Sequence, residues 1–477
     1  MKKLLYIIIF ILCLILSIFT ILNYDGNKIL YLFFKLISFI YPIHSILRKT
    51  FILDTYLSIF IWLGFWFKFS ITISFFDSVF PEGIGNFDQS AEAYDRLLFI
   101  SSFAIFLLIF FSYFANYFCL YKTSLIRKKK SLGLFYANNK KLIFLSFLFL
   151  VVLVNLLNYQ FNVHQKGIIS NYELSFLFTN LIKFLLMIGL PGIGIMILSA
   201  ELYETKNLTI STYLLILISS LITNVSMMSR AMIFNSTFIL YGLWRSKNKI
   251  LRKNFYKFIL LMLLITLISI FCSHNLRSHN IYNFNKLVKL DADNKIKNVA
   301  ARNNYFEELI HLVRSRFIGI DSLMAVMSHE NLNNDIMLRA FRENVDKKDY
   351  NFFTKEFNMK SKKKFNVDKL NFKDNVYAIA IPGFVAFSYY SGSLYIMTLF
   401  LLVFYILGIV IEYYAFKLSR KNLIVTSFIA GILAYRFMHF GYIPKNSYAL
   451  IIGIILFLIT VYIFEIILIK YYKRKET

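Results

Sequence analysis

Long apolar runs, separated by short polar or charged turns, recur along almost the whole 477-residue chain. A helix needs roughly 20 apolar residues to cross a bilayer, because its backbone groups must be satisfied without water. The runs therefore predict an all-α polytopic membrane protein with about twelve transmembrane helices. The expected spans are 4–22, 29–47, 51–76, 97–119, 142–160, 174–200, 209–227, 231–244, 256–274, 385–416, 423–439 and 447–469.

Charge between the runs predicts the orientation of the helices. The segments 120–141 and 245–257 carry many Lys and Arg residues and no acid, whereas 77–95 carries five acids and no Lys or Arg. By the positive-inside rule, the first two lie inside and the third lies outside. The run after Met1-Lys2-Lys3 is too long for a signal peptide, so we expect an uncleaved first helix with the N-terminus inside. The C-terminus is also expected inside.

The chain is thereby divided into three parts. Residues 1–274 hold the first nine spans, 275–376 form one large outer loop, and 377–477 hold the last three spans. The net charge of +27 does not indicate nucleic-acid binding, because the basic residues lie mostly between apolar runs, where they orient helices. The three cysteines form no CxxC pattern, so neither a disulfide framework nor a cysteine metal site is expected.

The loop 275–376 is the one long polar segment, so chemistry is expected on it or on the helix ends that face it. Apolar residues from Phe306 to Met324 recur at helical spacing and predict an amphipathic helix over 303–328. Its opposite, polar face would carry Glu307, His311, Arg314 and Asp321. The later segment, 342–375, is rich in Lys, Asn and Asp, and we expect a solvated, mobile connection there.

Four arginines and two histidines are the candidates for an anion site. Arg230 lies at an outer turn, where it either grips an anionic head group or snorkels to lipid phosphate. Arg436 and His439 lie one helical turn apart at the outer end of a span, as a site for an anionic substrate or as interfacial anchors. Arg277 follows the ninth span, and Arg316 is expected to pair with Asp321 or with substrate. His311 is a candidate base for a sugar hydroxyl, with Glu307 one turn away.

Several short segments resemble the O-antigen polymerase family, the Wzy class of oligosaccharide repeat-unit polymerases. They are the Met-Met-Ser-Arg turn at 227–230, EELIHLVRSRFIGID at 307–321, PGFVAFSYYSGS at 382–393 and HFGYIP at 439–444. The large outer loop between late helices is a further shared feature, and the likeness covers nearly the whole chain.

The resemblance implies glycosyl transfer at the periplasmic face of a bacterial inner membrane. The donor would be a glycan on undecaprenyl pyrophosphate, and the acceptor a repeat unit on the same lipid; membrane lipids and a chain-length regulator protein are the other partners. No cofactor or metal is implied. We assign pyrophosphate binding to Arg230, Arg277, Arg316 and Arg436. His311 and His439 are the candidate bases, Asp321 is the orienting acid, and the loop helix is the lid.

Two other functions stay open. A flippase or other transporter of lipid-linked sugars also has about twelve helices, but no repeat is visible in this sequence, and a transporter does not need a hundred-residue outer loop. An O-antigen ligase shares both the outer loop and the need for arginines.

Overall fold

The structure is a computed structural model. It describes residues 2–48, 51–80, 83–118, 130–165, 174–205, 209–229, 234–246, 256–273, 275–276, 314, 317–343, 351–358, 381–442 and 444–476. These residues form helices and turns, with no strand among them, as the apolar runs predicted.

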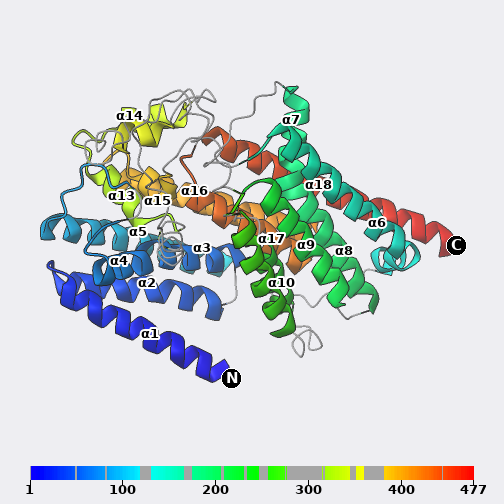
Figure 1. Ribbon diagram of the computed structural model, residues 1–477, viewed down its shortest axis with the longest axis horizontal. Helices are drawn as coiled ribbons and strands as arrows, with labels where there is room; N and C mark the ends of the chain where they lie inside the picture. Colours follow the sequence, from blue (N-terminus) through cyan, green and yellow to red (C-terminus); the bar gives the residue numbers. More distant parts are fainter. Residues whose placement is uncertain are drawn as a thin grey trace, which may run out of the picture.

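The described residues form a series of α-helices (Figure 1), with three short π-helical segments among them. In chain order they are α1 (Lys2–Asn23), α2 (Lys28–Arg48), α3 (Ile52–Trp62), η1 (Leu63–Phe67), α4 (Lys68–Phe75), α5 (Ala91–Phe118), α6 (Lys130–Phe161), α7 (Phe176–Phe184), η2 (Leu185–Gly189), α8 (Leu190–Thr205), α9 (Ile210–Ser226), α10 (Phe234–Arg245), α13 (Ile320–Met327), α14 (Asn334–Phe341), η3 (Thr354–Asn358), α15 (Gly383–Ser388), α16 (Leu394–Leu418), α17 (Leu423–Met438) and α18 (Pro444–Glu476). A further helix, Tyr256–Ser273, lies between α10 and α13 in the sequence.

Eight helices in the described part of the chain are long and apolar enough to cross a membrane. Three shorter apolar helices, Phe10–Asn23, Ile210–Ser226 and Leu423–Met438, accompany them. Each of the twelve predicted spans contains a helix, although the tenth is divided into α15 and α16 by the turn at 389–393. The structure is thus that of a multi-pass α-helical membrane protein, and the count of twelve crossings stays a prediction.

α17 forms the centre of the bundle. Every residue of this helix is buried except Tyr435 and Arg436 near its C-terminal end. A helix that is apolar on all sides must be surrounded, and α17 packs against α3, α10, α16 and α8. Its approach to α10 depends on Gly431, because a Cβ there would lie 2.2 Å from the ring of Phe238. Small residues at such contacts let membrane helices pack closely.

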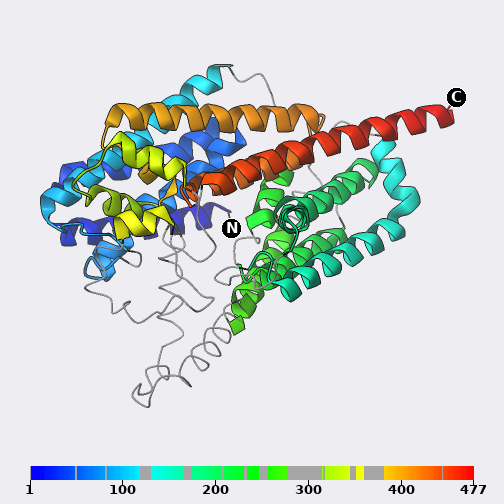
Figure 2. The same cartoon turned by 90° about the horizontal axis from the view of Figure 1, so that it is seen from above.

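α6, α7, η2, α8 and α9 form a second group, with its own apolar core (Figure 2). α16 and α18 contact each other along one face of the molecule. Polar caps fix where several helices begin. Thr209 caps α9 by accepting from Thr212 N, and Asn422 caps α17 by accepting from Ile424 N at 3.0 Å.

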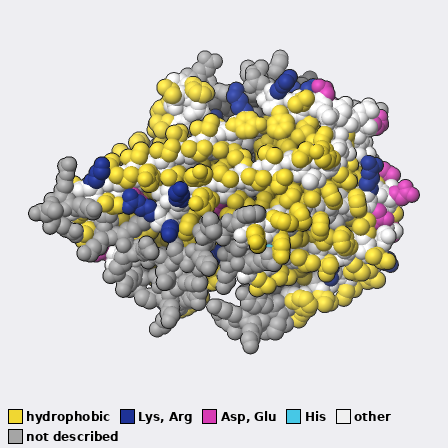
Figure 3. All heavy atoms as spheres, turned by 180° about the vertical axis from the view of Figure 1, so that it is seen from behind, with side chains coloured by type: hydrophobic (Ala, Val, Ile, Leu, Met, Phe, Trp, Pro, Cys, Tyr) yellow, Lys and Arg dark blue, Asp and Glu magenta, His cyan; other side chains and the backbone are white. Residues whose placement is uncertain are grey.

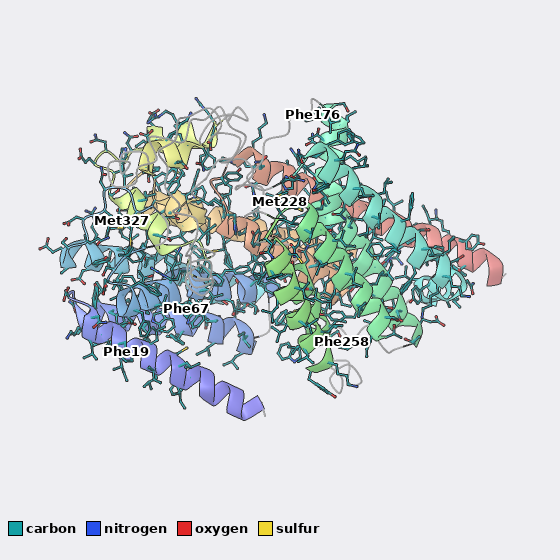
Figure 4. The ribbon with its side chains drawn as sticks, viewed as in Figure 1. Phe19, Phe67, Phe176, Met228, Phe258 and Met327 are labelled. Atoms are coloured by element: carbon teal, nitrogen blue, oxygen red, sulfur yellow. The ribbon has the colours of Figure 1, made fainter. Side chains whose placement is uncertain are left out.

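The two ends of the bundle differ in charge. Figure 3 shows a broad band of hydrophobic side chains, with acidic side chains gathered at the edge where α4 ends and α5 begins. We call this the outer end; α13 and α15 lie there (Figure 1). In the second group, Phe176 at the start of α7 and Met228 after α9 lie toward the top of Figure 4, whereas Phe258 lies near the bottom.

Candidate functional site

A buried ion pair joins the predicted loop to the membrane body. Lys68 Nζ lies 2.5 Å from Asp321 Oδ2, and the two side chains are 1% and 0% exposed. Lys68 Nζ also donates to the Phe317 carbonyl at 2.9 Å. Lys68 begins α4 and Asp321 stands in the first turn of α13, so one cation holds both the start of α13 and the residues before it. Buried charges are tolerated only when they are paired in this way.

Two glycines allow the backbones to meet beside this pair. A Cβ on Gly64 would lie 2.2 Å from the Ile318 carbonyl oxygen, and a Cβ on Gly319 would lie 2.4 Å from the Gly64 oxygen. Gly64 lies in η1, the π-helical segment just before Lys68. The predicted continuous helix over 303–328 is therefore wrong across 317–319. The chain is not helical there, because it turns against Gly64 and gives its Phe317 carbonyl to Lys68.

Arg314 is another cation of this region, and it is also buried. Its Nη2 donates to the Val79 carbonyl, and its guanidinium lies 3.6 Å from the centroid of the Phe76 ring. Burial lowers the pKa of the Arg314 guanidinium, and the nearby Asp321 carboxylate acts against that shift. The expectation that Arg314 and Asp321 occupy an exposed polar face is wrong, because both turn toward the membrane body.

The segment 351–358, expected as part of a solvated connection, is packed. Phe353 and Phe357 are 1% and 3% exposed. The Phe357 ring lies 4.7 Å from the ring of Tyr390, which follows α15, and η3 contacts α13. The abundant Lys and Asn residues of 342–375 predicted solvation, but three phenylalanines within 352–357 provide enough apolar surface to dock this part.

α15 connects the loop elements to the end of α17. Gly383 has a positive φ of 75°, and a Cβ there would lie 3.0 Å from both Ile318 Cγ2 and the Met438 oxygen. Ser322 Oγ donates to the Ile381 carbonyl at 2.7 Å, which fixes the start of this segment against α13. The structure therefore brings the region of Asp321 and the end of α17 to opposite sides of one glycine.

Arg436 and His439 lie at that end of α17. Arg436 Nε donates to Ser447 Oγ at 2.8 Å, and its Nη2 is buried with no hydrogen-bond partner in the described part of the chain. His439 follows the last helical residue, and its ring stacks on that of Tyr435 at 4.0 Å. His439 Nδ1 lies 2.8 Å from the Tyr435 carbonyl. A proton on Nδ1 donated to that oxygen makes Nε2 the basic nitrogen.

The remaining predicted site residues are Arg230, Arg277, Arg316 and His311, and they lie outside the described residues. The chain just before Arg230 is described. α9 ends at Ser226, and Met227 is its C-cap. Met228, the next residue, has a φ of 48°; its N donates to Val225 O at 3.0 Å, and Ser229 N donates to Asn224 O at 2.9 Å. This is a Schellman C-cap, which ends α9 at the start of the turn predicted for 228–230.

Lys68 is the residue that the sequence reasoning missed. The available signal was a lone lysine inside the apolar run 51–76, since ionisable groups at membrane depth need a partner or a function. Among the described residues, no group of three or more His, Cys, Asp or Glu side chains is placed to hold a metal ion. No family model, curated protein or solved structure matches this chain.

Proposed function

We propose that this protein polymerises oligosaccharide repeat units carried on undecaprenyl pyrophosphate, by glycosyl transfer at its outer end. The observation that carries the proposal is the guanidinium of Arg436. It stands at the outer end of the central helix, and its Nη2 has no partner among the described residues. A guanidinium with open donors suits a phosphate ligand, which it can bind through two oxygens.

The reaction has two electrostatic requirements. The bond between the donor sugar C1 and the pyrophosphate oxygen breaks, and both electrons leave with the phosphate. The acceptor hydroxyl oxygen bonds to C1, and its proton goes to a base. Fixed cations stabilise the leaving pyrophosphate, a role proposed for Arg436 together with Arg230, Arg277 and Arg316. His439, whose Nδ1 faces the Tyr435 carbonyl, is the described candidate base, and His311 is the other.

Asp321 has a different role in this proposal from that of an orienting acid. Its Oδ2 is 2.5 Å from Lys68 Nζ, and its side chain is fully buried. The pair fixes α13 against the membrane body, and α13 contacts α15, which contacts α17. Asp321 is therefore a positioning residue, which holds the loop beside Arg436 through α15.

Reconstitution tests the activity directly. The full chain in lipid vesicles receives an undecaprenyl-pyrophosphate-linked oligosaccharide from a bacterial producer, and products are separated by gel. A ladder of longer lipid-linked glycans with release of undecaprenyl pyrophosphate is expected. Transport of intact substrate across a vesicle membrane without any ladder indicates a flippase. Transfer only to a lipid A-core acceptor indicates a ligase.

The pyrophosphate role is tested with variants of Arg436. Arg436→Gln should lower the polymerisation rate by about 10²-fold or more, as expected when one donor to a developing charge is removed. Arg436→Lys keeps the charge and should retain part of the rate. The matched control is Arg339→Gln, because Arg339 lies on α14, is half exposed and pairs with Asp335. Full activity of Arg436→Gln at normal protein levels would contradict the proposed role.

A further inference from the structure

A groove lies between α6 and α8, away from the outer end. Its volume is about 320 Å³, and its lining is apolar apart from Asn139 and Ser146. Leu142, Phe147 and Ile197 are among the side chains that form its walls. On α6 the groove is lined by residues from Phe135 to Leu150, so it covers the start of the predicted span 142–160.

A break in α6 accounts for the groove. Asn139 has φ −124° and ψ 18°, which is not helical, although α6 continues on both sides. α6 packs closely against α8, and two of their close approaches lie on either side of this break. A Cβ on Gly133 of α6 would lie 3.0 Å from Glu204 Oε2 of α8. A Cβ on Gly194 of α8 would lie 3.5 Å from the Phe147 ring of α6. The groove lies along the stretch between these two contacts.

Two lysines lie next to Asn139, which lines the groove. Lys140 and Lys141 follow Asn139 directly, and both are exposed. Lys140 Nζ lies 3.8 Å from Glu201 Oε1, at the limit of an ion pair, and is 49% exposed. Glu201 already accepts from Thr209 Oγ1 at 2.8 Å. Lys140 therefore keeps donors for an anion at the membrane surface, and Lys141 adds a second charge.

We propose that this groove binds an acyl chain of an anionic phospholipid from the inner leaflet, with the lipid phosphate on Lys140 and Lys141. The apolar walls favour a hydrocarbon chain over water. The charges favour an anionic head group, because basic residues beside a span attract acidic lipids. This site is independent of the proposed glycosyl transfer, since it lies at the other end of the bundle from Arg436.

Native mass spectrometry of the full-length protein tests the proposal. The protein is purified in detergent and supplied with phosphatidylglycerol or phosphatidylcholine, and the retained lipid is counted. Each lysine contributes roughly fivefold to affinity for an anionic lipid, so a preference of about fivefold to thirtyfold for phosphatidylglycerol is expected. Lys140→Gln with Lys141→Gln should abolish the preference. The control is Lys417→Gln, which removes an exposed lysine from the last turn of α16.

A second variant separates the groove from the charges. Ser146→Phe with Ile197→Phe fills the groove and should reduce retention of both lipids, whereas Leu145→Phe, on the exposed side of α6, should not. An unchanged gel-filtration profile shows that each variant is folded. Equal retention of the two lipids by the unmodified protein would overturn the proposal, and so would full retention by the filled variant. If the unmodified protein is a dimer and the filled variant is a monomer, the groove binds a second copy of this chain instead of a lipid.

Discussion

The Lys68–Asp321 ion pair should act as the anchor of the outer loop. At 2.5 Å the gross attraction is about 7 kcal/mol with an effective dielectric constant of about 20. Desolvation of the two ions, at several kcal/mol each, offsets most of it. The pair thus stabilises the fold little more than two apolar side chains would. Removing only one partner leaves a buried unpaired charge, which costs about 3–5 kcal/mol of folding stability. We expect Lys68→Met to fall in that range. Asp321→Leu should cost less, because Lys68 keeps the Phe317 carbonyl.

The loss of stability can be measured as a higher rate of thiol labelling, because labelling requires α13 to undock. The reporter is Ala325→Cys, since Ala325 lies in α13 and is fully buried, in a background with Cys13, Cys119 and Cys272 changed to Ser. A buried thiol reacts only when α13 undocks, so the rate follows the open population. A loss of 3–5 kcal/mol raises that rate by about 10²- to 10⁴-fold.

The double variant decides the interpretation. Lys68→Met with Asp321→Leu removes both charges, so its labelling rate should lie well below that of Lys68→Met alone. Arg339→Met provides the comparison, because the Arg339–Asp335 pair is exposed and should contribute less than about 1 kcal/mol. If the costs of the two single changes simply add in the double variant, the side chains do not interact and the anchor does not exist.

Three further changes test the packing, each by the thermal unfolding midpoint in detergent. Gly64→Ala places a Cβ 2.2 Å from the Ile318 oxygen and should destabilise the protein by about 1–3 kcal/mol, whereas Gly194→Ala, whose nearest neighbour is a side-chain atom at 3.3 Å, should be tolerated. Glu412→Ala removes the acceptor of Ile52 N and Leu53 N and should cost about 1–3 kcal/mol, with Glu412→Gln milder. Phe357→Ala should cost about 3–5 kcal/mol if 351–358 is part of the core, and no loss there would contradict the packing against Tyr390.

The sequence predicted where helices form much better than how the loop packs. Apolar runs located every described helix of the membrane body, because length and hydrophobicity are local properties. The end of α9 was also predictable, since the apolar run 209–227 stops there, one residue after Ser226. The number of helices that cross the membrane is not given by helix formation alone. In the described part of the chain, eight helices are long and apolar enough to cross.

The break at 317–319 could not be read from helical periodicity. Ile310, Val313, Phe317 and Ile320 continue one apolar stripe, and the spacing is equally compatible with an unbroken helix. The non-helical conformation of 317–319 accompanies a contact between Gly319 and Gly64, which lie far apart in the sequence. Tertiary contacts of this kind override local propensity, and a single sequence carries no trace of them.

Partial inference of the ion pair was nevertheless possible from charge alone. Lys68 lies toward the outer end of the span 51–76, so a compensating acid had to come from an outer segment. The acids of 77–95 stand among polar residues, whereas Asp321 stands in Phe-Ile-Gly-Ile-Asp-Ser-Leu-Met, where burial is expected. Burying Asp321 or Lys68 alone would cost free energy, and pairing the two charges reduces that cost.

This pairing changes how a glycan could enter the proposed site. A lid that lifts as one body would separate Lys68 from Asp321, and the stranded charge costs about 3–5 kcal/mol. The undocked state would then be populated at only about 10⁻² to 10⁻⁴. A growing chain that must bind and leave in every cycle would face that penalty each time. α13 is therefore better understood as a fixed wall of the site, against which α15 and the end of α17 present Arg436.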